Sequence, residues 1–234
     1  MKKITIAIDG PAGSGKSTSA RRIAHELQYT YLDTGAMYRA ITLAFLEQGL
    51  DVHSMDVESV LRGLNVRVEQ HADGQHTYLG DRDISERIRQ ADVTAAVSAV
   101  SAIPAVRERL VAIQQEIGRS GGIVMDGRDI GTVVFPDAEL KIFLVASIEE
   151  RARRRLMESG ASAMAVEDVA RDLVERDRKD STRSVSPLVK ADDAIEIDTS
   201  NLSIEDQVQQ IVRLARERIN DGSSKKLHVG TNDK

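Results

Sequence analysis

A phosphate-binding pattern near the N-terminus carries the strongest chemical signal in the sequence. Residues 10–17 read Gly-Pro-Ala-Gly-Ser-Gly-Lys-Ser and match G-x-x-x-x-G-K-[S/T] in full. In this pattern the glycines let backbone N–H groups converge on an anion, the lysine reaches the outer phosphates of a nucleoside triphosphate, and the hydroxyl is a Mg²⁺ ligand. We expect these residues and their successor to bind the triphosphate: Gly10, Pro11, Ala12, Gly13, Ser14, Gly15, Lys16, Ser17 and Thr18.

The segments around this motif have the strand, loop and helix order that a phosphate-binding loop requires. Residues 4–9 form an apolar run of strand length, and residues 16–28 carry apolar side chains at helical spacing. A helix that starts at the loop adds its N-terminal dipole to the anion site. This context disfavours the alternative reading, a glycine-rich turn with a surface lysine.

A phosphate-binding loop does not by itself distinguish kinases from switches, transporters and motors. The sequence lacks the Asn-Lys-x-Asp pattern with which many GTPases read guanine, and it lacks the Leu-Ser-Gly-Gly-Gln signature of transporter ATPases. About 200 ordered residues also leave little room for the additional domains of a motor. The pattern therefore favours a small ATP-dependent kinase.

Two further segments bring arginines to the expected position of the phosphate loop. Residues 33–39 follow the second predicted strand and end in Arg39, and residues 126–129 follow another strand and include Arg128. In an open parallel sheet, ligands bind beyond the carboxyl ends of the strands. Two guanidinium forks at that edge fit a second phosphate that faces the first.

At these motifs the sequence resembles the bacterial cytidylate kinases. The resemblance runs from about residue 4 to residue 219 and is carried by residues 9–18, 33–39, 104–107 with Ser98, 126–136 and 175–188. The run Asp-Gly-Arg-Asp-Ile-Gly-Thr-Val-Val-Phe-Pro at residues 126–136 is long and specific to that family. A predicted β-hairpin between residues 65 and 84 matches the enlarged monophosphate-binding domain of bacterial members.

The resemblance implies a cytosine pocket formed by Thr34, Ser98, Arg107 and Asp129. Cytosine offers an N4 amine that a carboxylate accepts, and its N3 and O2 atoms accept hydrogen bonds from arginine and hydroxyl groups. Uracil places an acceptor where cytosine has the amine, so a polar pocket can discriminate by about 10⁴–10⁵. We expect Asp129 and Arg107 to decide the choice of base.

The resemblance also implies roles for residues that bind the rest of the substrates. Arg39, Arg128 and Arg183 would hold the CMP phosphate and, with Lys16, form the catalytic set. Arg176 and Asp180 would contact the sugar, and Asp126 would join Ser17 at Mg²⁺. The family's lid over ATP falls on Arg151, Arg153, Arg154 and Arg155, although a solvated face of salt bridges explains such a charged stretch as well.

Strand-like and helix-like segments alternate along the chain, which favours an α/β fold with a parallel sheet. Further predicted elements are strands at residues 29–32, 123–126, 140–145 and 194–198 and helices at 36–48 and 203–219. We expect a P-loop core with a parallel five-stranded sheet flanked by helices, a monophosphate-binding insert with a small antiparallel sheet, and a helical lid. The expected parts are the core at residues 1–35, 92–146 and 184–220, the insert at 36–91, the lid at 147–183, and a disordered tail at 221–234.

Composition excludes several other classes of protein. The net charge is −5 and aromatic residues make up 3% of the sequence, which argues against nucleic-acid binding. There is no cysteine, so disulfides and thiolate chemistry are excluded, and no apolar run reaches the length of a membrane span. The five histidines show no spacing typical of a metal site. We expect a monomer in the cytoplasm that binds ATP, CMP and dCMP and neither nucleic acid nor membrane.

Two other functions stay open at the level of the sequence. Another small-molecule kinase, acting on UMP, AMP or shikimate, would share the phosphate loop but need different residues at positions 107 and 129. A nucleotide-gated binding module would bind ATP tightly without phosphorylating a monophosphate. Arginines after separate strands disfavour the module, because a switch has no second phosphate to hold.

Overall fold

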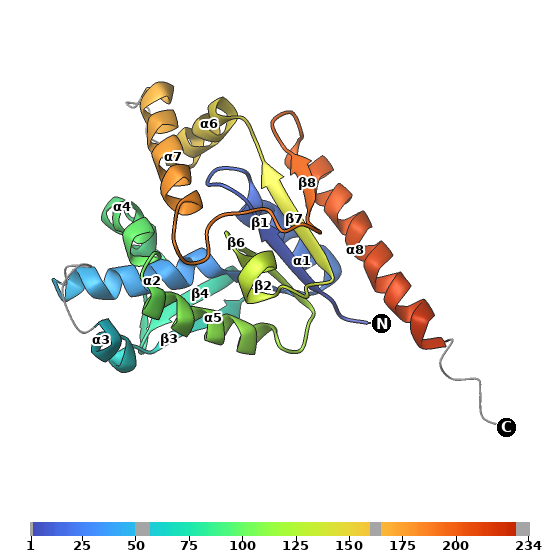
Figure 1. Ribbon diagram of the computed structural model, residues 1–234, viewed down its shortest axis with the longest axis horizontal. Coiled ribbons are helices and arrows are strands. Elements are labelled where there is room, and N and C mark those ends of the chain that lie inside the picture. Colours follow the sequence, from blue (N-terminus) through green and yellow to red (C-terminus); the bar gives the residue numbers. More distant parts are fainter. Residues whose placement is uncertain (1, 50–56, 160–164, 228–234) are drawn as a thin grey trace.

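The centre of the molecule is a five-stranded parallel sheet, described here from a computed structural model (Figure 1). The structure describes residues 2–49, 57–159 and 165–227. The strand order is β2-β6-β1-β7-β8, and every neighbouring pair is parallel. The strands are β1 (Thr5–Asp9), β2 (Thr30–Asp33), β6 (Ile123–Gly127), β7 (Leu140–Val145) and β8 (Ile195–Asp198). The predicted fold class and all five predicted strands are confirmed, with ends that shift by one residue or none.

Helices cover both faces of this sheet, which explains why its inner strands β1, β6 and β7 are buried along most of their length. Along β1, Ile6 and Ile8 join the buried cluster of α1 (Lys16–Leu27) and α8 (Ile204–Leu227), whereas Ala7 joins the cluster on the opposite face. This alternation follows from the two-residue period of a strand. The opposite cluster is built by α2 (Thr34–Glu47), α4 (Ala91–Val100) and α5 (Pro104–Gly118).

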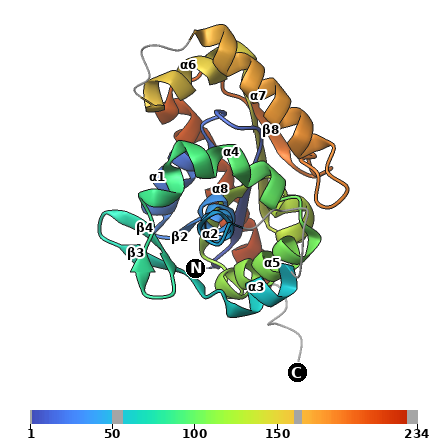
Figure 2. The same ribbon diagram turned by 90° about the vertical axis from the view of Figure 1, so that its left-hand side faces the viewer.

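Helix α2 connects the main sheet with a smaller antiparallel sheet. Figure 2 looks along α2 and shows it surrounded by α4, α5 and the small sheet. The small sheet has the order β3-β4-β5, with β3 (Val66–His71), β4 (Gly74–Leu79) and β5 (Arg82–Asp83). The predicted hairpin is confirmed, and β5 adds a two-residue strand that its charged sequence did not indicate. Helix α3 (Val57–Gly63) and the 3₁₀ turn η1 (Arg87–Arg89) complete this region.

Two helices form a lobe beside the phosphate loop, and Figure 1 shows them together at one end of the molecule. They are α6 (Ile148–Ser159) and α7 (Val166–Ser181), and residues 160–164 between them lie outside the described residues. Ala152, Val169 and Leu173 form a small buried cluster, and Ala12 of the loop packs against it. The lobe is therefore attached to the loop by apolar contact as well as by charge.

Serine hydroxyls cap the starts of α6 and α8. Ser147 Oγ accepts from the Glu150 N–H at 3.2 Å, and Ser203 Oγ accepts from the Asp206 N–H at 3.1 Å. The Ser147 N–H in turn donates to Ser200 Oγ at 2.8 Å. The start of α6 is therefore also bonded to a segment distant in the sequence.

The C-terminal helix differs from the prediction in its length. Helix α8 continues to Leu227, so residues 221–227 are helical where the sequence predicted the start of a disordered tail. The polar composition of this stretch lacks apolar periodicity, but a helix that is already nucleated extends at little cost. Residues 228–234 lie outside the described residues. None of the helices in the described segments is long and apolar enough to cross a membrane.

Candidate active site

A cavity of about 710 Å³ opens beyond the carboxyl ends of β1, β2 and β6. Among the predicted nucleotide-binding residues, those in the cavity wall are Ala12, Gly13, Gly15, Lys16, Ser17, Thr18, Thr34, Arg39, Ser98, Arg107, Asp126, Arg128, Asp129, Arg176, Asp180 and Arg183. Gly10, Pro11 and Ser14 are not part of the wall. The structure therefore brings together residues that were predicted from five separate stretches of sequence.

The phosphate loop is held in a conformation that side chains would obstruct. Gly13 and Gly15 have φ values of 78° and 88°, and a Cβ atom at Gly10 would lie 2.1 Å from the Leu144 carbonyl oxygen. Ser14 Oγ donates to the Pro11 carbonyl at 3.0 Å, which braces the loop from within. Gly10 and Ser14 thus shape the loop, while the residues that line the cavity present its surface.

Lys16 lies at the base of the cavity and is 5% exposed. Its Nζ atom donates to the Pro11 carbonyl oxygen at 2.6 Å and to Ser14 Oγ at 3.4 Å. Burial, followed by the nearby charge of Arg128, lowers the pKa of Lys16 well below its usual value. A phosphate placed here would restore the favourable environment for the ammonium form.

Ser17 and Asp126 form an oxygen-rich corner next to this lysine. Ser17 Oγ donates to Asp126 Oδ2 at 2.7 Å, and the Tyr31 hydroxyl donates to Asp126 Oδ1 at 2.8 Å. Burial, with the nearby Asp33, raises the pKa of Asp126. Mg²⁺ prefers a few protein oxygens and completes its shell with water and substrate phosphates. A hydroxyl and a carboxylate beside a phosphate loop fit that preference.

Arg107 and Asp129 meet in the wall of the same cavity. They form an ion pair in which both side chains are almost fully buried, with 3% and 5% of their surfaces exposed. Arg107 Nη1 also donates to the Ser101 carbonyl at 3.0 Å, and its guanidinium carbon lies 5.1 Å from the centre of the Tyr38 ring. The pair is thereby fixed in one orientation, with a carboxylate and a guanidinium side by side.

The arginines predicted to hold a second phosphate line this cavity as well. Arg39 pairs with Asp33 at 3.0 Å, and Arg128 Nε donates to Asp180 Oδ2 at 2.9 Å. Arg183 Nε donates to the Asp180 carbonyl oxygen at 3.2 Å. Burial, followed by the charge of Arg128, lowers the pKa of Arg176 to about 10. Crowded, desolvated cations of this kind are typical of an anion site.

Several nitrogens of this cluster have no hydrogen-bond partner within the described segments. They are Arg39 Nε, Arg107 Nε, Arg176 Nε and Arg183 Nη2. A buried donor without a partner costs about 1–3 kcal/mol, so such groups are rare unless a ligand satisfies them. All four belong to side chains of the cavity wall, and buried groups without a partner are often found at functional sites.

Comparison with known proteins assigns the chain to a family. Residues 6–217 match the family model described as cytidylate kinase. The chain is 55% identical to a cytidylate kinase from Streptococcus gordonii over 223 residues, which cover 92% of this chain and 98% of that protein. It is 50% identical to a cytidylate kinase from Exiguobacterium sibiricum over 218 residues, covering 92% and 98% respectively. The chain belongs to the cytidylate kinase family.

Solved structures with much lower sequence identity share the architecture of this cytidylate kinase family member. An uncharacterized protein from Eubacterium ventriosum superposes with a TM-score of 0.50 at 12% identity, covering 92% of this chain and 99% of that one. At such identity the likeness shows the fold alone.

The structure also shows two acidic residues that sequence reasoning did not select: Asp33 lines the cavity, and Asp9 supports its wall from behind. Asp33 accepts from the Ala36 N–H at 2.9 Å as the N-cap of α2, and it fixes Arg39 with its second oxygen. Asp9, at the end of β1, accepts from the N–H groups of Ile130 and Gly131 at 2.9 and 2.8 Å. Asp9 therefore holds the π-helical turn η2 (Ile130–Val134), which follows Asp129 directly.

A sequence signal existed for some of these added residues. Asp33 and Asp9 each stand at the end of a predicted strand, and Asp33 precedes a predicted helix, the position typical of an N-cap. Arg21, Tyr38, Arg89 and Ser101 also line the cavity, but their sequence context carries no such signal.

The four arginines of α6, the helix expected to belong to a lid, have different surroundings. Arg151 is buried and bonds the Ala12 carbonyl at 3.0 Å and Asp177 at 2.6 Å, and Arg154 bonds the Thr199 carbonyl at 2.6 Å. Arg153 pairs with Glu150 on the surface, whereas Arg155 lines the cavity. Arg153 therefore lies on a solvated face, and among the four arginines only Arg155 lines the cavity.

Proposed function

We propose that this member of the cytidylate kinase family transfers the γ-phosphoryl group of ATP to CMP and dCMP, and that it does so in the cavity described above. The observation that carries the proposal is that one cavity is lined by Lys16, by the arginines Arg39, Arg128, Arg176 and Arg183, and by the buried Arg107–Asp129 pair. The family membership supports the same reaction. The products would be ADP together with CDP or dCDP.

The loop end of the cavity would bind the triphosphate of ATP. Backbone N–H groups of residues 10–18 would surround the β- and γ-phosphates, and Lys16 would leave the Pro11 carbonyl to contact them. Ser17 and Asp126 would hold Mg²⁺, which neutralises phosphate charge when bound. The lid at residues 147–183 would cover ATP, with Arg155 directed at its phosphates.

The central arginines would orient the phosphate of CMP toward ATP. Arg39, Arg128 and Arg183 already lie in the cavity wall, each fixed by a hydrogen bond to an acidic residue or its backbone. Arg176 and Asp180, which come from α7, would contact the sugar hydroxyls. Because Arg183 follows the end of α7 by two residues, a movement of α7 over the sugar would also bring Arg183 to the CMP phosphate.

The Arg107–Asp129 pair would read the base. The Asp129 carboxylate would accept from cytosine N4, and the guanidinium of Arg107 would donate to N3 or O2. Ser98 lies nearby in the wall. The Thr34 hydroxyl donates its proton to the Asp126 carbonyl at 2.7 Å. In this orientation its oxygen could only accept a hydrogen bond from cytosine, and donation to cytosine would require the hydroxyl to rotate.

The transfer reaction requires neutralisation of phosphate charge more than it requires a general base. The second pKa of a phosphate monoester is about 6, so CMP is largely a dianion at neutral pH and can attack directly. Four arginines and Lys16 would offset the repulsion between the two phosphates and stabilise the charge that develops during transfer. Excluding water by closure of the lid and of the insert at residues 36–91 would suppress ATP hydrolysis.

An acceptor panel tests this proposal against its alternatives. Purified protein with ATP and Mg²⁺ is incubated with CMP, dCMP, UMP, AMP or shikimate, and both nucleotide products are quantified. We expect equal amounts of ADP and CDP with CMP and much slower turnover with UMP. Turnover with AMP or shikimate in place of CMP would identify a different kinase, and tight ATP binding without any turnover would identify a binding module.

The monomeric state and the cytoplasmic location remain predictions within this proposal. Every predicted substrate-binding residue comes from one chain, so no second subunit is needed to complete the cavity. Size-exclusion chromatography with light scattering is expected to give a mass near 25.7 kDa. A stable dimer would contradict that prediction without affecting the reaction.

A further inference from the structure

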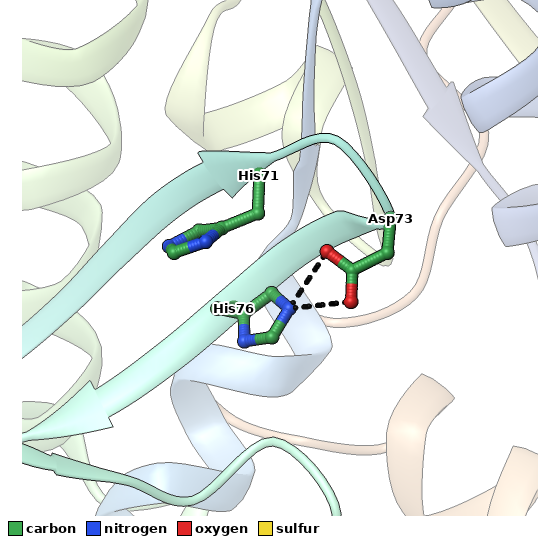
Figure 3. Close-up of side chains that lie close together, drawn as sticks. All are labelled: His71, Asp73 and His76. Atoms are coloured by element: carbon green, nitrogen blue, oxygen red, sulfur yellow. Dashed lines mark hydrogen bonds and ion pairs between the residues drawn. The ribbon is translucent and has the colours of Figure 1, made fainter.

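The turn between β3 and β4 gathers two histidines and an aspartate outside the cavity. His71 ends β3, Asp73 lies in the turn and His76 is on β4, and the possible ligand atoms of all three lie within 4.8 Å of one another (Figure 3). The spacing of the five histidines in the sequence gave no indication of a metal site. The fold brings these two together because the hairpin reverses the chain.

The register of the hairpin explains why the two imidazoles share a face. Glu69 is opposite His76 and His71 is opposite Gly74, so the histidines are diagonal neighbours. The intervening pair, Gln70 and Gln75, points the other way and bonds the Tyr31 carbonyl and Asp33. The histidines are therefore on the outer face, where a dissolved ion can reach them.

We propose that His71, Asp73 and His76 bind a divalent transition-metal ion of the Zn²⁺ type. Imidazole nitrogens combined with a carboxylate oxygen suit Zn²⁺, Ni²⁺ or Cu²⁺, whereas Mg²⁺ prefers oxygen ligands in octahedral geometry. This site would therefore not compete with the corner formed by Ser17 and Asp126 for magnesium. Water would complete the coordination shell on the exposed side.

The spacing of the ligand atoms is close to what zinc requires. His76 Nε2 lies 3.0 and 3.1 Å from the two Asp73 oxygens, as the dashed lines of Figure 3 mark. Tetrahedral bonds of about 2.0–2.1 Å place ligand atoms about 3.3 Å apart, so this pair would separate only slightly. His71 would move farther, and it is free to do so because 41% of its side chain is exposed.

A second carboxylate orients His76 for coordination. His76 Nδ1 lies 2.6 Å from Asp83 Oδ2, and Asp83 is in turn held by the Ser85 hydroxyl at 2.6 Å and the Ser85 N–H at 2.9 Å. Histidines that bind metals usually donate their other ring N–H to a carboxylate, which fixes the tautomer that leaves Nε2 as the ligand. Asp83 provides that partner.

The remaining contacts of His71 are weak enough to be exchanged. Its Nε2 atom lies 3.4 Å from both Glu69 Oε2 and the Tyr78 hydroxyl, and its ring centre is 4.3 Å from that of His76. Turning the ring toward Asp73 would give up these long contacts and keep the two imidazoles adjacent. Glu69 would stay close enough to contribute its charge to the site.

Calorimetric titration of the full chain with ZnCl₂, in the presence of excess Mg²⁺, tests the proposal. We expect one Zn²⁺ per chain for the wild type and at least tenfold weaker binding for His71→Ala and for His71→Ala/His76→Gln. Asp83→Asn is expected to keep the stoichiometry but to bind about 10–100-fold more weakly, as removal of an outer-shell partner does. His25→Ala, which removes an exposed histidine of α1, is the matched control and should bind as the wild type does.

Circular dichroism without metal shows whether each variant is folded. If the double variant does not fold, His71→Ala alone still tests whether His71 binds the ion. Unchanged zinc binding in His71→Ala and in Asp83→Asn would overturn the proposal. So would the absence of zinc binding by the wild type, or an equal loss of binding in His25→Ala.

Discussion

Arg107 and Asp129 form an ion pair that is almost fully buried in the wall of the cavity. Burying two charges is costly, and such a pair often contributes little to stability relative to apolar residues of the same volume. A paired carboxylate and guanidinium at the surface of a cavity nevertheless present an acceptor and donors in a fixed order. That order matches cytosine and mismatches uracil, so we expect this pair to be kept for specificity.

The first prediction concerns the choice of base. Asp129→Asn keeps the shape of the side chain but adds an amide donor, which suits the O4 acceptor of uracil. We expect kcat/KM for CMP to fall about 100-fold or more, the preference for CMP over UMP to collapse, and KM for ATP to stay unchanged. Steady-state kinetics with both acceptors measures this. An unchanged preference for CMP would show that other residues read the base.

A second prediction concerns Gln75, which supports the phosphate site from the hairpin. Gln75 Oε1 accepts from the Asp33 N–H at 2.8 Å, and Asp33 fixes Arg39. Because Gln75→Ala frees the backbone of Asp33, we expect KM for CMP to rise several-fold, with KM for ATP unchanged. His71→Ala, on the outer face of the same hairpin, is the control and should leave both constants unchanged. Equal effects of the two variants would indicate a general loss of hairpin structure.

A third prediction compares two cations, Lys16 in the phosphate loop and Arg153 on the exposed face of α6, by the effect of their removal on kcat. Lys16→Met removes the buried ammonium at the loop, and we expect kcat to fall by about 10²–10³, as for loss of one group that stabilises developing charge. Arg153→Ala removes a surface partner of Glu150 and should leave kcat within twofold of the wild type. Kinetics at saturating ATP and CMP gives both values. A large effect of Arg153→Ala would mean that α6 contacts substrate through a different face.

The fourth prediction concerns Asp9 and pH. Burial raises the pKa of Asp9 to about 6, although the N–H groups of Gly131 and Ile130 oppose the shift. The folded state therefore binds this proton more tightly than the unfolded chain does, so the contribution of Asp9 to stability falls as pH rises from about 4 to 6 and is constant above that. The change is on the order of 3 kcal/mol.

Urea unfolding of the wild type and of Asp9→Asn between pH 4 and pH 8 isolates this contribution, because other carboxyl groups cancel in the difference. We expect the difference in the free energy of unfolding, wild type minus variant, to decrease with rising pH up to about pH 6. A difference that grows with pH would show instead that Asp9 is stabilised as a carboxylate.

Much of the fold could be predicted because local patterns determine it. The apolar runs around Ile6 and Ile142 are strands buried on both faces, and the glycines of the phosphate loop allow a turn that side chains would block. The hairpin was visible in the alternation at residues 66–79. These features depend on residues that are close in sequence, so no knowledge of the tertiary contacts was required.

The parts that could not be predicted depend on contacts between distant segments. The bond between Gln75 and Asp33 joins the insert to the end of β2, and nothing in either sequence context indicates it. Arg151 and Arg153 are two residues apart, yet one is buried against the loop and the other is exposed, because successive helical residues face different directions. The roles of single lid arginines therefore required the structure.

The most direct test of the single-cavity account is the binding of a bisubstrate analogue in which adenosine and cytidine are joined by a pentaphosphate. The account predicts one analogue per chain, competition with both ATP and CMP, and weaker binding in both Lys16→Met and Arg39→Ala. An analogue that competes with only one of the two nucleotides, or whose binding is insensitive to one of these substitutions, would show that the two phosphates do not meet in this cavity.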